Sequence, residues 1–392
     1  MTMPIINRVA DLLPDIVAWR RDLHTHPELM YDVHRTAALV AEKLREFGCD
    51  EVVSGLGRTG VVAVINGRQP ADGQAVQSIG LRADMDALPI KEATGLPYAS
   101  KTPGVMHACG HDGHTAMLLG AARYLAETRN FAGRAVLIFQ PAEEGGGGAA
   151  AMIADGLVER FAIDQMYGMH NGPGMPLGTF ALRPGAIMAS TDSIDLRIEG
   201  VGGHAARPHN SIDPVLAGAK LVIALQSIVS RSVDPLESAV LSMCEFHAGS
   251  ARNVIPHTAE LKGTVRTLSP QIRDLMEQRV REVVAGVAQL TGTSIELSYE
   301  RGYPVVVNHD AQTAHAAAVA AEIVGEGRVM DMPPLMSAED FAYMLEARPG
   351  ALIFIGNGNS AGLHHPAYDF NDDAIVFGTS YWIRLVETTL AA

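Results

Sequence analysis

Hydrophobic residues in the first half of the chain recur with two alternating periods. Helical spacing extends from Ile5 to Leu23 and from Arg35 to Phe47, and a third helix is expected from about His114 to Thr128. Short apolar runs bounded by glycine, proline or polar residues predict strands at Gly60 to Ile65, Ser78 to Ala83, Ala135 to Phe139 and Gln165 to Met169. This alternation predicts an α/β fold with a mostly parallel central sheet and helices on both faces.

The pattern changes near Gly185. Six elements are expected from there to Glu300, in the order strand, helix, strand, strand, helix, strand: Thr191 to Glu199, Pro214 to Val229, Ser238 to Phe246, Thr258 to Thr267, Gln271 to Leu290 and Ser294 to Glu300. That order is typical of a ferredoxin-like α+β unit. After Tyr303 the earlier alternation resumes through Ala311 to Val324, Ala338 to Leu345 and Leu352 to Ile355, and a last helix ends near Leu390.

These patterns predict two domains, of which the first is discontinuous. Residues 1–186 and 302–392 would form a larger domain, and residues 187–301 a smaller domain inserted into it. A length of 392 residues agrees with this division, since it exceeds what one hydrophobic core usually organises.

Composition narrows the range of partners. A net charge of −14 and the lack of a Lys/Arg-rich stripe argue against binding to nucleic acid or to anionic membranes. A small anionic substrate remains compatible if metal ions or an arginine supply local positive charge. Three scattered cysteines do not suggest a disulfide framework, and we find neither a signal-peptide pattern nor 18 consecutive apolar residues. We therefore expect a cytoplasmic protein with a small-molecule substrate.

The densest group of metal-binding side chains is His107-Ala-Cys109-Gly-His111-Asp112-Gly-His114, just before a predicted helix. A buried cysteine with polar helix-capping neighbours is the alternative, but one thiol, three imidazoles and a carboxylate within eight residues favour a metal site. Cys109 and His111 are the first-choice ligands.

Other candidate ligands follow predicted strands, where α/β proteins bind their ligands. Glu143 and Glu144 end the strand at Phe139, and because neighbours in an extended chain point in opposite directions, one is expected to bind metal and the other to transfer protons. A solvated acidic turn is the alternative. His170 ends another strand, and His364 is preferred over His365 after a polar loop.

Asp84 and Asp86 follow the strand at Ala83 and share a face, so that one could hold a ligating histidine in place. Exposed aspartates at a strand end are the alternative. The mixture of thiolate, imidazole and carboxylate groups suits Zn, Mn, Co or Ni better than Ca or Mg.

The inserted domain carries Gly202-Gly203-His204, together with single polar residues Asn253 and Arg266. Because paired glycines are most often found in turns, a hairpin turn without a functional role is the alternative interpretation of this motif.

Taken together, the motifs make the chain resemble the aminoacylase and hippurate hydrolase branch of the di-metal amidohydrolase and carboxypeptidase superfamily, which includes plant auxin-conjugate hydrolases. The resemblance covers almost the whole chain. Its motifs are His24-Thr-His26-Pro27-Glu28-Leu29, Arg82-Ala-Asp84-Met-Asp86-Ala-Leu-Pro89, the His107 to His114 segment, Gln140-Pro-Ala-Glu143-Glu144-Gly145, Gly203-His204-Ala-Ala-Arg-Pro-His209, Ser337-Ala-Glu339-Asp340-Phe341 and His364-His365-Pro366.

The resemblance implies a metal-dependent hydrolase of N-acyl amino acids with two divalent ions per subunit. It implies the metal ligands Cys109, His111, Glu144, His170 and His364, with Cys109 bridging the ions. Other branches have a ligating histidine at the position of Asp84 and an aspartate at that of Cys109, which leaves the identity of the metal open.

The same resemblance implies the remaining roles. Glu143 would be the general base, and Asp86 joins the catalytic set. His204 would donate to the oxyanion, in its own or a partner's active site, and Asn253 and Arg266 are candidates for holding the substrate carboxylate. A homodimer, or a larger oligomer built from dimers, through the inserted domain is implied as well.

Two other functions stay open from the residues. An exopeptidase acting on dipeptides would need an additional acidic partner for the free amine. A non-catalytic protein stabilised by metal would more often have closely spaced Cys and His ligands than ligands spread from Cys109 to His364.

Overall fold

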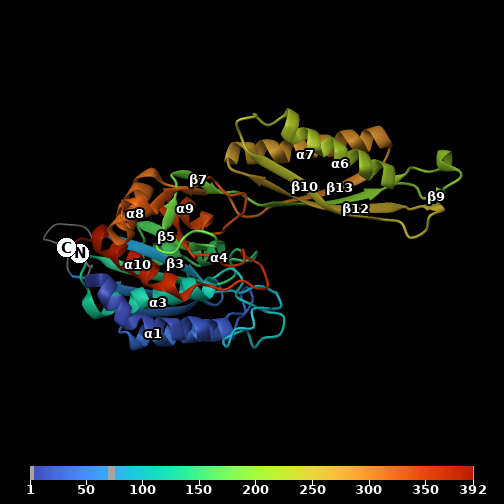
Figure 1. Ribbon diagram of the computed structural model, residues 1–392. Helices are drawn as coiled ribbons and strands as arrows, with labels where there is room; N and C mark the ends of the chain where they lie inside the picture. Colours follow the sequence, from blue (N-terminus) through green and yellow to red (C-terminus); the bar gives the residue numbers. More distant parts are fainter. Residues whose placement is uncertain (1–3, 69–75, 392) are drawn as a thin grey trace. The chain divides into compact units, whose positions relative to one another are not determined.

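A computed structural model of the chain describes residues 4–68 and 76–391. The chain forms two compact units (Figure 1). Unit 1 comprises Met1–Gly185, Val307–Pro333 and Asp340–Ala392, and unit 2 comprises Ala186–Val306 and Pro334–Glu339.

Unit 1 is built on an eight-stranded sheet with the order β1-β2-β4-β3-β5-β16-β6-β15. The four neighbouring strands β4, β3, β5 and β16 are parallel, whereas β1, β2 and β6 join the sheet by antiparallel pairs. The bounds are β1 Glu51–Leu56, β2 Gly60–Asn66, β3 Ser78–Asp84, β4 Arg134–Gln140, β5 Gln165–Gly172, β6 Phe180–Leu182, β15 Val329–Asp331 and β16 Gly350–Gly356. The parallel strands place their carboxyl ends at one edge of the sheet.

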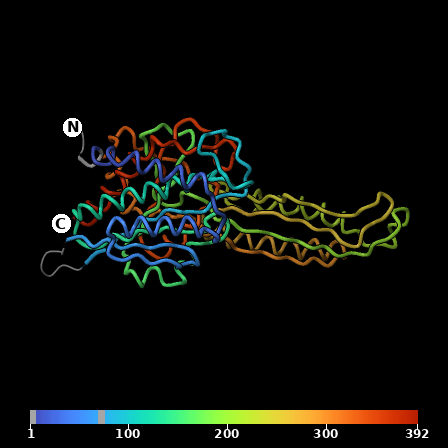
Figure 2. Tube along the Cα trace, turned by 90° about the horizontal axis from the view of Figure 1, so that it is seen from below, coloured from blue at the N-terminus to red at the C-terminus, as the bar shows by residue number. Residues whose placement is uncertain are grey.

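Helices cover both faces of this sheet. One face packs against α1, α2, α3, α8 and α10 in a continuous apolar core, and α1 and α3 run side by side (Figure 2). On the other side α4 contacts β4 and α9. The bounds are α1 Pro4–Thr25, α2 His34–Glu46, α3 His111–Thr128, α4 Gly148–Ala154, α5 Leu157–Arg160, α8 Asp310–Val324, α9 Ala342–Ala347 and α10 Ile375–Thr389. The predicted α/β class is confirmed.

Unit 2 has the predicted order strand, helix, strand, strand, helix, strand. Its sheet has the order β10-β12-β8-β13, and α6 and α7 supply the apolar side chains packed against it. The bounds are β8 Asp192–Glu199, α6 Pro214–Arg231, β10 Ala239–Ala248, β12 Thr258–Thr267, α7 Pro270–Thr291 and β13 Ser294–Arg301. Within the described residues α6 is the single helix long and apolar enough to cross a membrane, but Ala217, Leu221, Leu225 and Ile228 lie in the core of unit 2.

The hydrophobic periodicity did not predict the edge strand β1 or several short elements. The edge strand β1 exposes three of its six residues, so it lacks an apolar run. Other short elements are β7 Gly185–Met188, β9 Gly203–His204, β11 Val254–Ile255, β14 Val306–Asn308 and the 3₁₀ turns Pro208–Asn210, Glu326–Arg328 and Asp372–Ala374. The segment predicted from Ala338 is helical only from Ala342 onwards.

Candidate active site

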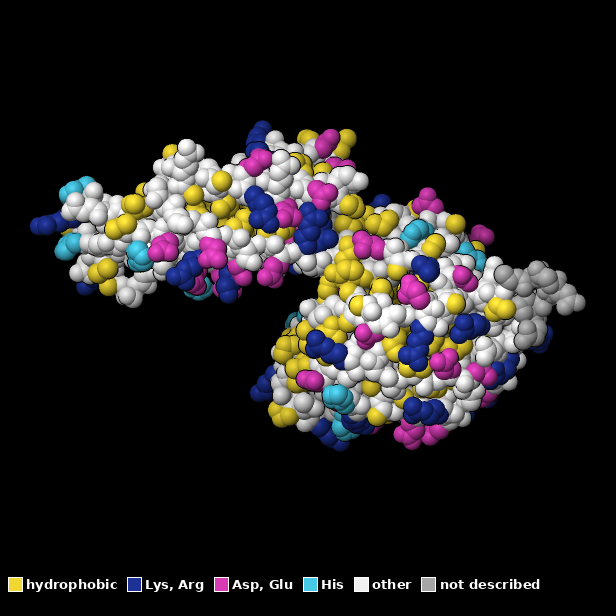
Figure 3. All heavy atoms as spheres, turned by 180° about the vertical axis from the view of Figure 1, so that it is seen from behind, with side chains coloured by type: hydrophobic (Ala, Val, Ile, Leu, Met, Phe, Trp, Pro, Cys, Tyr) yellow, Lys and Arg dark blue, Asp and Glu magenta, His cyan; other side chains and the backbone are white. Residues whose placement is uncertain are grey.

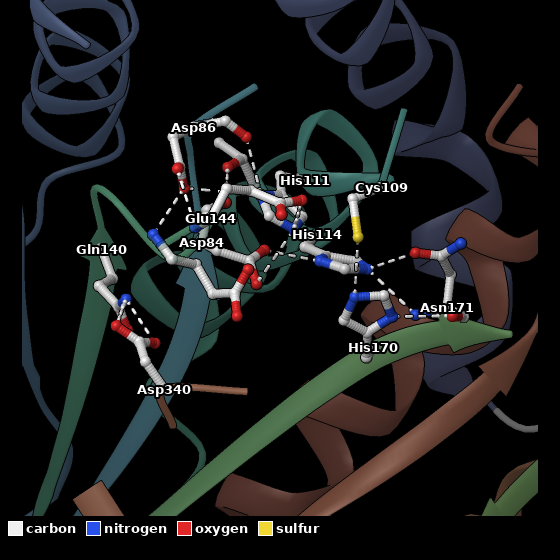
Figure 4. A network of polar contacts seen from close by, with 12 residues as sticks. Asp84, Asp86, Cys109, His111, His114, Gln140, Glu144, His170, Asn171 and Asp340 are labelled. Atoms are coloured by element: carbon white, nitrogen blue, oxygen red, sulfur yellow. Dashed lines mark hydrogen bonds and ion pairs between the residues drawn. The ribbon is translucent and has the colours of Figure 1, made fainter. Parts of the chain in front are cut away.

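Polar side chains gather at the carboxyl edge of the parallel strands in unit 1 (Figure 4). Asp84 ends β3, and Asp86 follows it. Glu144 follows β4, and His170 lies near the end of β5, the strand beside β3. His111 opens α3, which follows β3 in the sequence. The strand order therefore brings together residues that are far apart along the chain.

The five side chains predicted as ligands meet at this edge. The Cys109 thiol lies 3.4 Å from Nε2 of His170. Glu144 Oε1 lies 3.3 Å from Nε2 of His364 and 3.9 Å from Nε2 of His111. Two groups of ligand atoms within 4.8 Å of one another consist of these five side chains alone: Cys109 with His111 and His170, and Cys109 with Glu144 and His364. Cys109 is common to both groups.

Gly110 makes this arrangement possible. Its φ of 94° is left-handed, and it joins Cys109 to the first residue of α3. A Cβ at this position would lie 2.3 Å from Oδ1 of Asn171 and 2.7 Å from the hydroxyl of Tyr368. Glycine therefore meets both the conformational and the steric requirement.

Asp86 organises the segment that carries the two glutamates. Its carboxylate accepts hydrogen bonds from the backbone amides of Glu143, at 2.9 Å, and Glu144, at 3.1 Å. The carbonyl of Asp86 also accepts a hydrogen bond from Nδ1 of His111, at 2.7 Å, which leaves Nε2 of that ring for another partner. Asp86 thus lies behind the site and positions other residues.

The expectation that Glu143 and Glu144 point in opposite directions is not met. They lie in a turn rather than in extended chain, because Ala142 before them is left-handed with a φ of 55°. The ligand atoms of both carboxylates lie within 4.8 Å of one another and of His111. Glu143 is nevertheless placed beside the ligand group, where a proton-transfer role requires it.

The electrostatics of the site call for added positive charge. Burial, with Glu144, Glu143 and Asp84 nearby, raises the pKa of the Cys109 thiol well above its usual range. Burial alone would lower the pKa of His111, but Asp84, Asp86 and Glu144 raise it to about 10. A thiol and an imidazole that hold their protons so firmly indicate an excess of negative charge.

The donor set fits divalent metal ions. Nε2 of His111 is buried and has no hydrogen-bond partner among the described residues. Burial, assisted by His114, lowers the pKa of His170 to about 3, so this ring is neutral as a metal ligand must be. An orphaned nitrogen, a neutral imidazole, a thiol and a carboxylate at this spacing are typical of a transition-metal site.

Residues behind the ligands complete the site, and sequence reasoning did not assign them. Nδ1 of His114 lies 2.6 Å from Asp84, and its Nε2 accepts from the backbone amide of Asn171 at 3.0 Å. The side chain of Asn171 donates to Tyr368 at 2.6 Å. The spacing of His111 and His114, three residues apart at the start of a helix, was the available signal for a shared face.

The other predicted residues, His204, Asn253 and Arg266, belong to unit 2. His204 pairs with Val254 across β9 and β11, and the carbonyl of Asn253 accepts from Ala205 at 3.1 Å. Figure 3 shows histidine side chains at one end of unit 2. Exposed His209 lies in the 3₁₀ turn Pro208–Asn210, which contacts β9.

Arg266 lies at the other end of β12, opposite Val240 and next to Thr267, whose carbonyl accepts from Ser190. Thr258, at the end of β12 nearer Asn253, is roughly 26 Å from Arg266 at about 3.3 Å per residue. Within one chain the two side chains therefore lie too far apart to hold the same carboxylate, and a joint role would need residues from two chains.

Comparison with known proteins places these residues in context. The profile of peptidase family M20/M25/M40 matches residues 80–388. The chain is 46% identical to the hippurate hydrolase of Campylobacter jejuni, over 98% of each chain. It is 42% identical to the N-acetyl-L-cysteine deacetylase of Bacillus subtilis, over 94% of this chain and 86% of that one. A solved structure of a dinuclear metal-binding M20 peptidase from Bacillus subtilis superposes with a TM-score of 0.84 at 34% identity, covering 97% of this chain and 99% of that one.

Proposed function

This chain belongs to peptidase family M20/M25/M40, and on that premise we propose that it hydrolyses the amide bond of N-acyl amino acids to a carboxylic acid and a free amino acid. The observation that carries the proposal is the convergence of Cys109, His111, Glu144, His170 and His364 beside Glu143. Relatives named for hippurate and for N-acetyl-L-cysteine point to this substrate class.

The five converging side chains would hold two divalent ions, drawn from Zn, Mn, Co or Ni. When bound, the ions polarise the scissile carbonyl and make a water molecule acidic enough to attack it near neutral pH. Cys109 is common to both ligand groups, so its thiolate would help to hold both ions.

Glu143 is assigned as the general base. Its backbone amide donates a hydrogen bond to the carboxylate of Asp86, and its own carboxylate lies beside His111 and Glu144. It would take a proton from the attacking water and return it to the leaving amine, a contribution typically of about 10²- to 10⁴-fold in rate. Asp86 contributes by positioning Glu143, Glu144 and His111 rather than by touching the substrate.

His204 is assigned as the donor to the developing oxyanion, and Arg266 or Asn253 as the carboxylate-binding residue. His204 and Asn253 share one end of unit 2, whereas Arg266 lies at the end where the chain enters and leaves that unit. A single chain therefore offers the two groups at widely separated places. A homodimer would remove this separation. One chain would supply Arg266 to an active site, and the second chain would supply His204 and Asn253 to the same site.

The surface of unit 2 supports such a dimer. β10 is the edge strand of its sheet, with Val240 and Phe246 exposed. Leu216 and Ile223 on α6 are exposed at 55% and 75%. An unpaired strand edge beside exposed apolar side chains is a natural surface for pairing with an identical copy.

All three cysteines, Cys49, Cys109 and Cys244, are free thiols. Together with the net charge of −14, this supports a cytoplasmic enzyme that acts on small molecules rather than on nucleic acid or membranes.

A substrate panel tests the proposed function. Purified protein is stripped of metal, reloaded separately with Mn, Zn, Co and Ni, and incubated with benzoyl, acetyl, indole-acetyl and fatty-acyl amino acids and with dipeptides. Metal-dependent release of free amino acid from at least one acyl class is expected. Cleavage confined to dipeptides would show that the protein is an exopeptidase instead. If no substrate is cleaved in a metal-dependent way, the remaining function is that of a non-catalytic binding protein stabilised by metal.

A further inference from the structure

We propose that Arg82 and Asp84 are positioning residues, and that Arg82 holds Asp84 away from metal coordination so that Asp84 fixes the ligand-bearing segments from behind. The proposal rests on the ligand set assigned above. It concerns a carboxylate that lies close enough to the site to compete for an ion.

Asp84 lies beside a nitrogen that is assigned to metal. Its Oδ2 lies 3.6 Å from Nε2 of His111, the ring nitrogen that has no hydrogen-bond partner and is assigned to metal. A sixth protein ligand here would occupy a coordination position that water or substrate needs in a catalytic site.

Both carboxylate oxygens of Asp84 accept hydrogen bonds from other side chains. Oδ1 accepts from Nδ1 of His114 at 2.6 Å, and Oδ2 accepts from a guanidinium nitrogen of Arg82 at 2.7 Å. Asp84 and Arg82 are 0% and 1% exposed, so the pair is shielded from bulk solvent. A buried carboxylate paired in this way gives up its cation only at a large cost.

Through His114 the pair reaches the strand that carries His170. The backbone amide of Asn171 has a fixed direction, and it donates to Nε2 of His114 at 3.0 Å. Nε2 also lies 2.8 Å from the side-chain oxygen Oδ1 of Asn171, and Nδ1 on the opposite side of the ring lies 2.6 Å from Oδ1 of Asp84. Asp84 thus fixes the position of a ring that contacts the residue next to His170.

Through Arg82 the same pair reaches the segment that carries Glu143 and Glu144. Arg82 donates to the side chain of Gln140 at 2.8 Å and to Asp340 at 3.0 Å. Asp340 also accepts from Gln140 at 2.8 Å and from the backbone amide of Ala149 at 2.9 Å. Gln140 and Ala149 flank the two glutamates, so one buried network holds both ligand-bearing segments.

The decisive variant is Asp84→Asn, which keeps the shape of the side chain but removes its charge. Metal content is measured after saturation, and affinity by equilibrium dialysis with Zn. We expect two ions per chain, as in the wild type, bound about 10- to 100-fold more weakly, the usual effect of losing a residue that supports ligands. One ion per chain would make Asp84 a ligand, and unchanged affinity would remove it from the site; either result overturns the proposal.

Arg82 is tested by the rise in melting temperature on adding metal. Arg82→Met leaves Asp84 without its cation, so metal should stabilise this variant more than it stabilises the wild type, with Arg82→Lys intermediate. In the double variant Arg82→Met/Asp84→Asn, added metal should raise the melting temperature only as much as it does in the wild type. An equal rise in Arg82→Met and in wild type would contradict the role of Arg82.

Arg273→Met is the matched control, because Arg273 pairs with buried Asp192 in unit 2, whereas the assigned metal ligands belong to unit 1. It should lower the melting temperature without changing metal affinity. If Arg82→Met does not fold, Asp84→Asn decides alone. A wild-type protein that binds no metal would defeat the ligand set itself, which keeps the two failures distinguishable.

Discussion

The thiol of Cys109 lies 3.4 Å from Nε2 of His170, although the two residues are 61 positions apart in the sequence. The contact joins the segment before α3 to the end of β5. It exists because β3, which leads towards Cys109, and β5 are parallel neighbours. The first prediction follows from this pair.

Cys109→Ala should abolish high-affinity metal binding, since the thiol belongs to both ligand groups. Metal content measured after dialysis should fall from two ions per chain towards zero, and amide hydrolysis should fall with it. Cys109→Ser, which keeps a weaker ligand, is the conservative companion. Full metal content in Cys109→Ala would show that the ligand set is wrong.

Glu143→Gln should separate chemistry from metal binding. Turnover should fall by about 10²- to 10⁴-fold because the general base is lost. Metal content should stay at two ions per chain, since Glu143 is not assigned as a ligand. Glu144→Gln is the matched comparison and should lose metal. Loss of metal in Glu143→Gln would make this residue a ligand instead.

Metal binding should release protons. In the metal-free protein the pKa of Cys109 is raised well above its usual range and that of His111 is raised to about 10, so both are protonated at pH 7. Both must lose a proton to bind metal, so affinity should rise with pH. Calorimetry in buffers of different ionisation enthalpy should detect about two protons released at pH 7. Release of none would contradict the assigned ligands.

His24 should make stability depend on pH outside the metal site. Burial lowers its pKa, but Asp112, at 2.8 Å, and Glu92, at 3.3 Å, raise it to about 9. A pKa raised above the unfolded value of about 6.5 contributes stability that is complete below pH 6.5 and is lost as pH rises through 9. Urea unfolding of the metal-free protein should show this decline. His24→Asn should flatten the curve, and an equal slope in both proteins would contradict the prediction.

Catalysis by residues from two chains should be visible as complementation. His204→Ala and Glu143→Gln should each be nearly inactive. Mixed and re-associated, they should recover about a quarter of wild-type activity, because half of the dimers contain one site with both residues intact. No recovery, despite exchange of chains shown by mass spectrometry, would place His204 in its own chain's site or outside catalysis.

The central architecture could be predicted from the sequence because it depends on local signals. Periodicity located the parallel strands, and the rule that ligands bind beyond their carboxyl ends selected Asp84, Glu144 and His170. Cys109 and His111 stood out by residue type alone. His364 lies in a loop with a φ of 62°, without periodicity, and depended on the resemblance to known hydrolases.

The rest depended on tertiary contacts that no local pattern contains. Asn171 meets Tyr368 across 197 positions, and Arg82 meets Asp340 across 258. The orientation of Glu143 and Glu144 was missed because a left-handed Ala142 turns the chain where extended backbone was expected. The separation of Asn253 and Arg266 depends on the length of β12, which extends from Thr258, on the side of Asn253, to Thr267, next to Arg266.

The most direct test of the two-metal account is a titration of stripped protein with a single metal, following hydrolysis of an N-acyl amino acid and metal content together. Activity should rise with added metal and reach its plateau at two ions per chain. Full hydrolysis by the stripped protein, or a plateau that Cys109→Ala reaches equally well, would contradict the account.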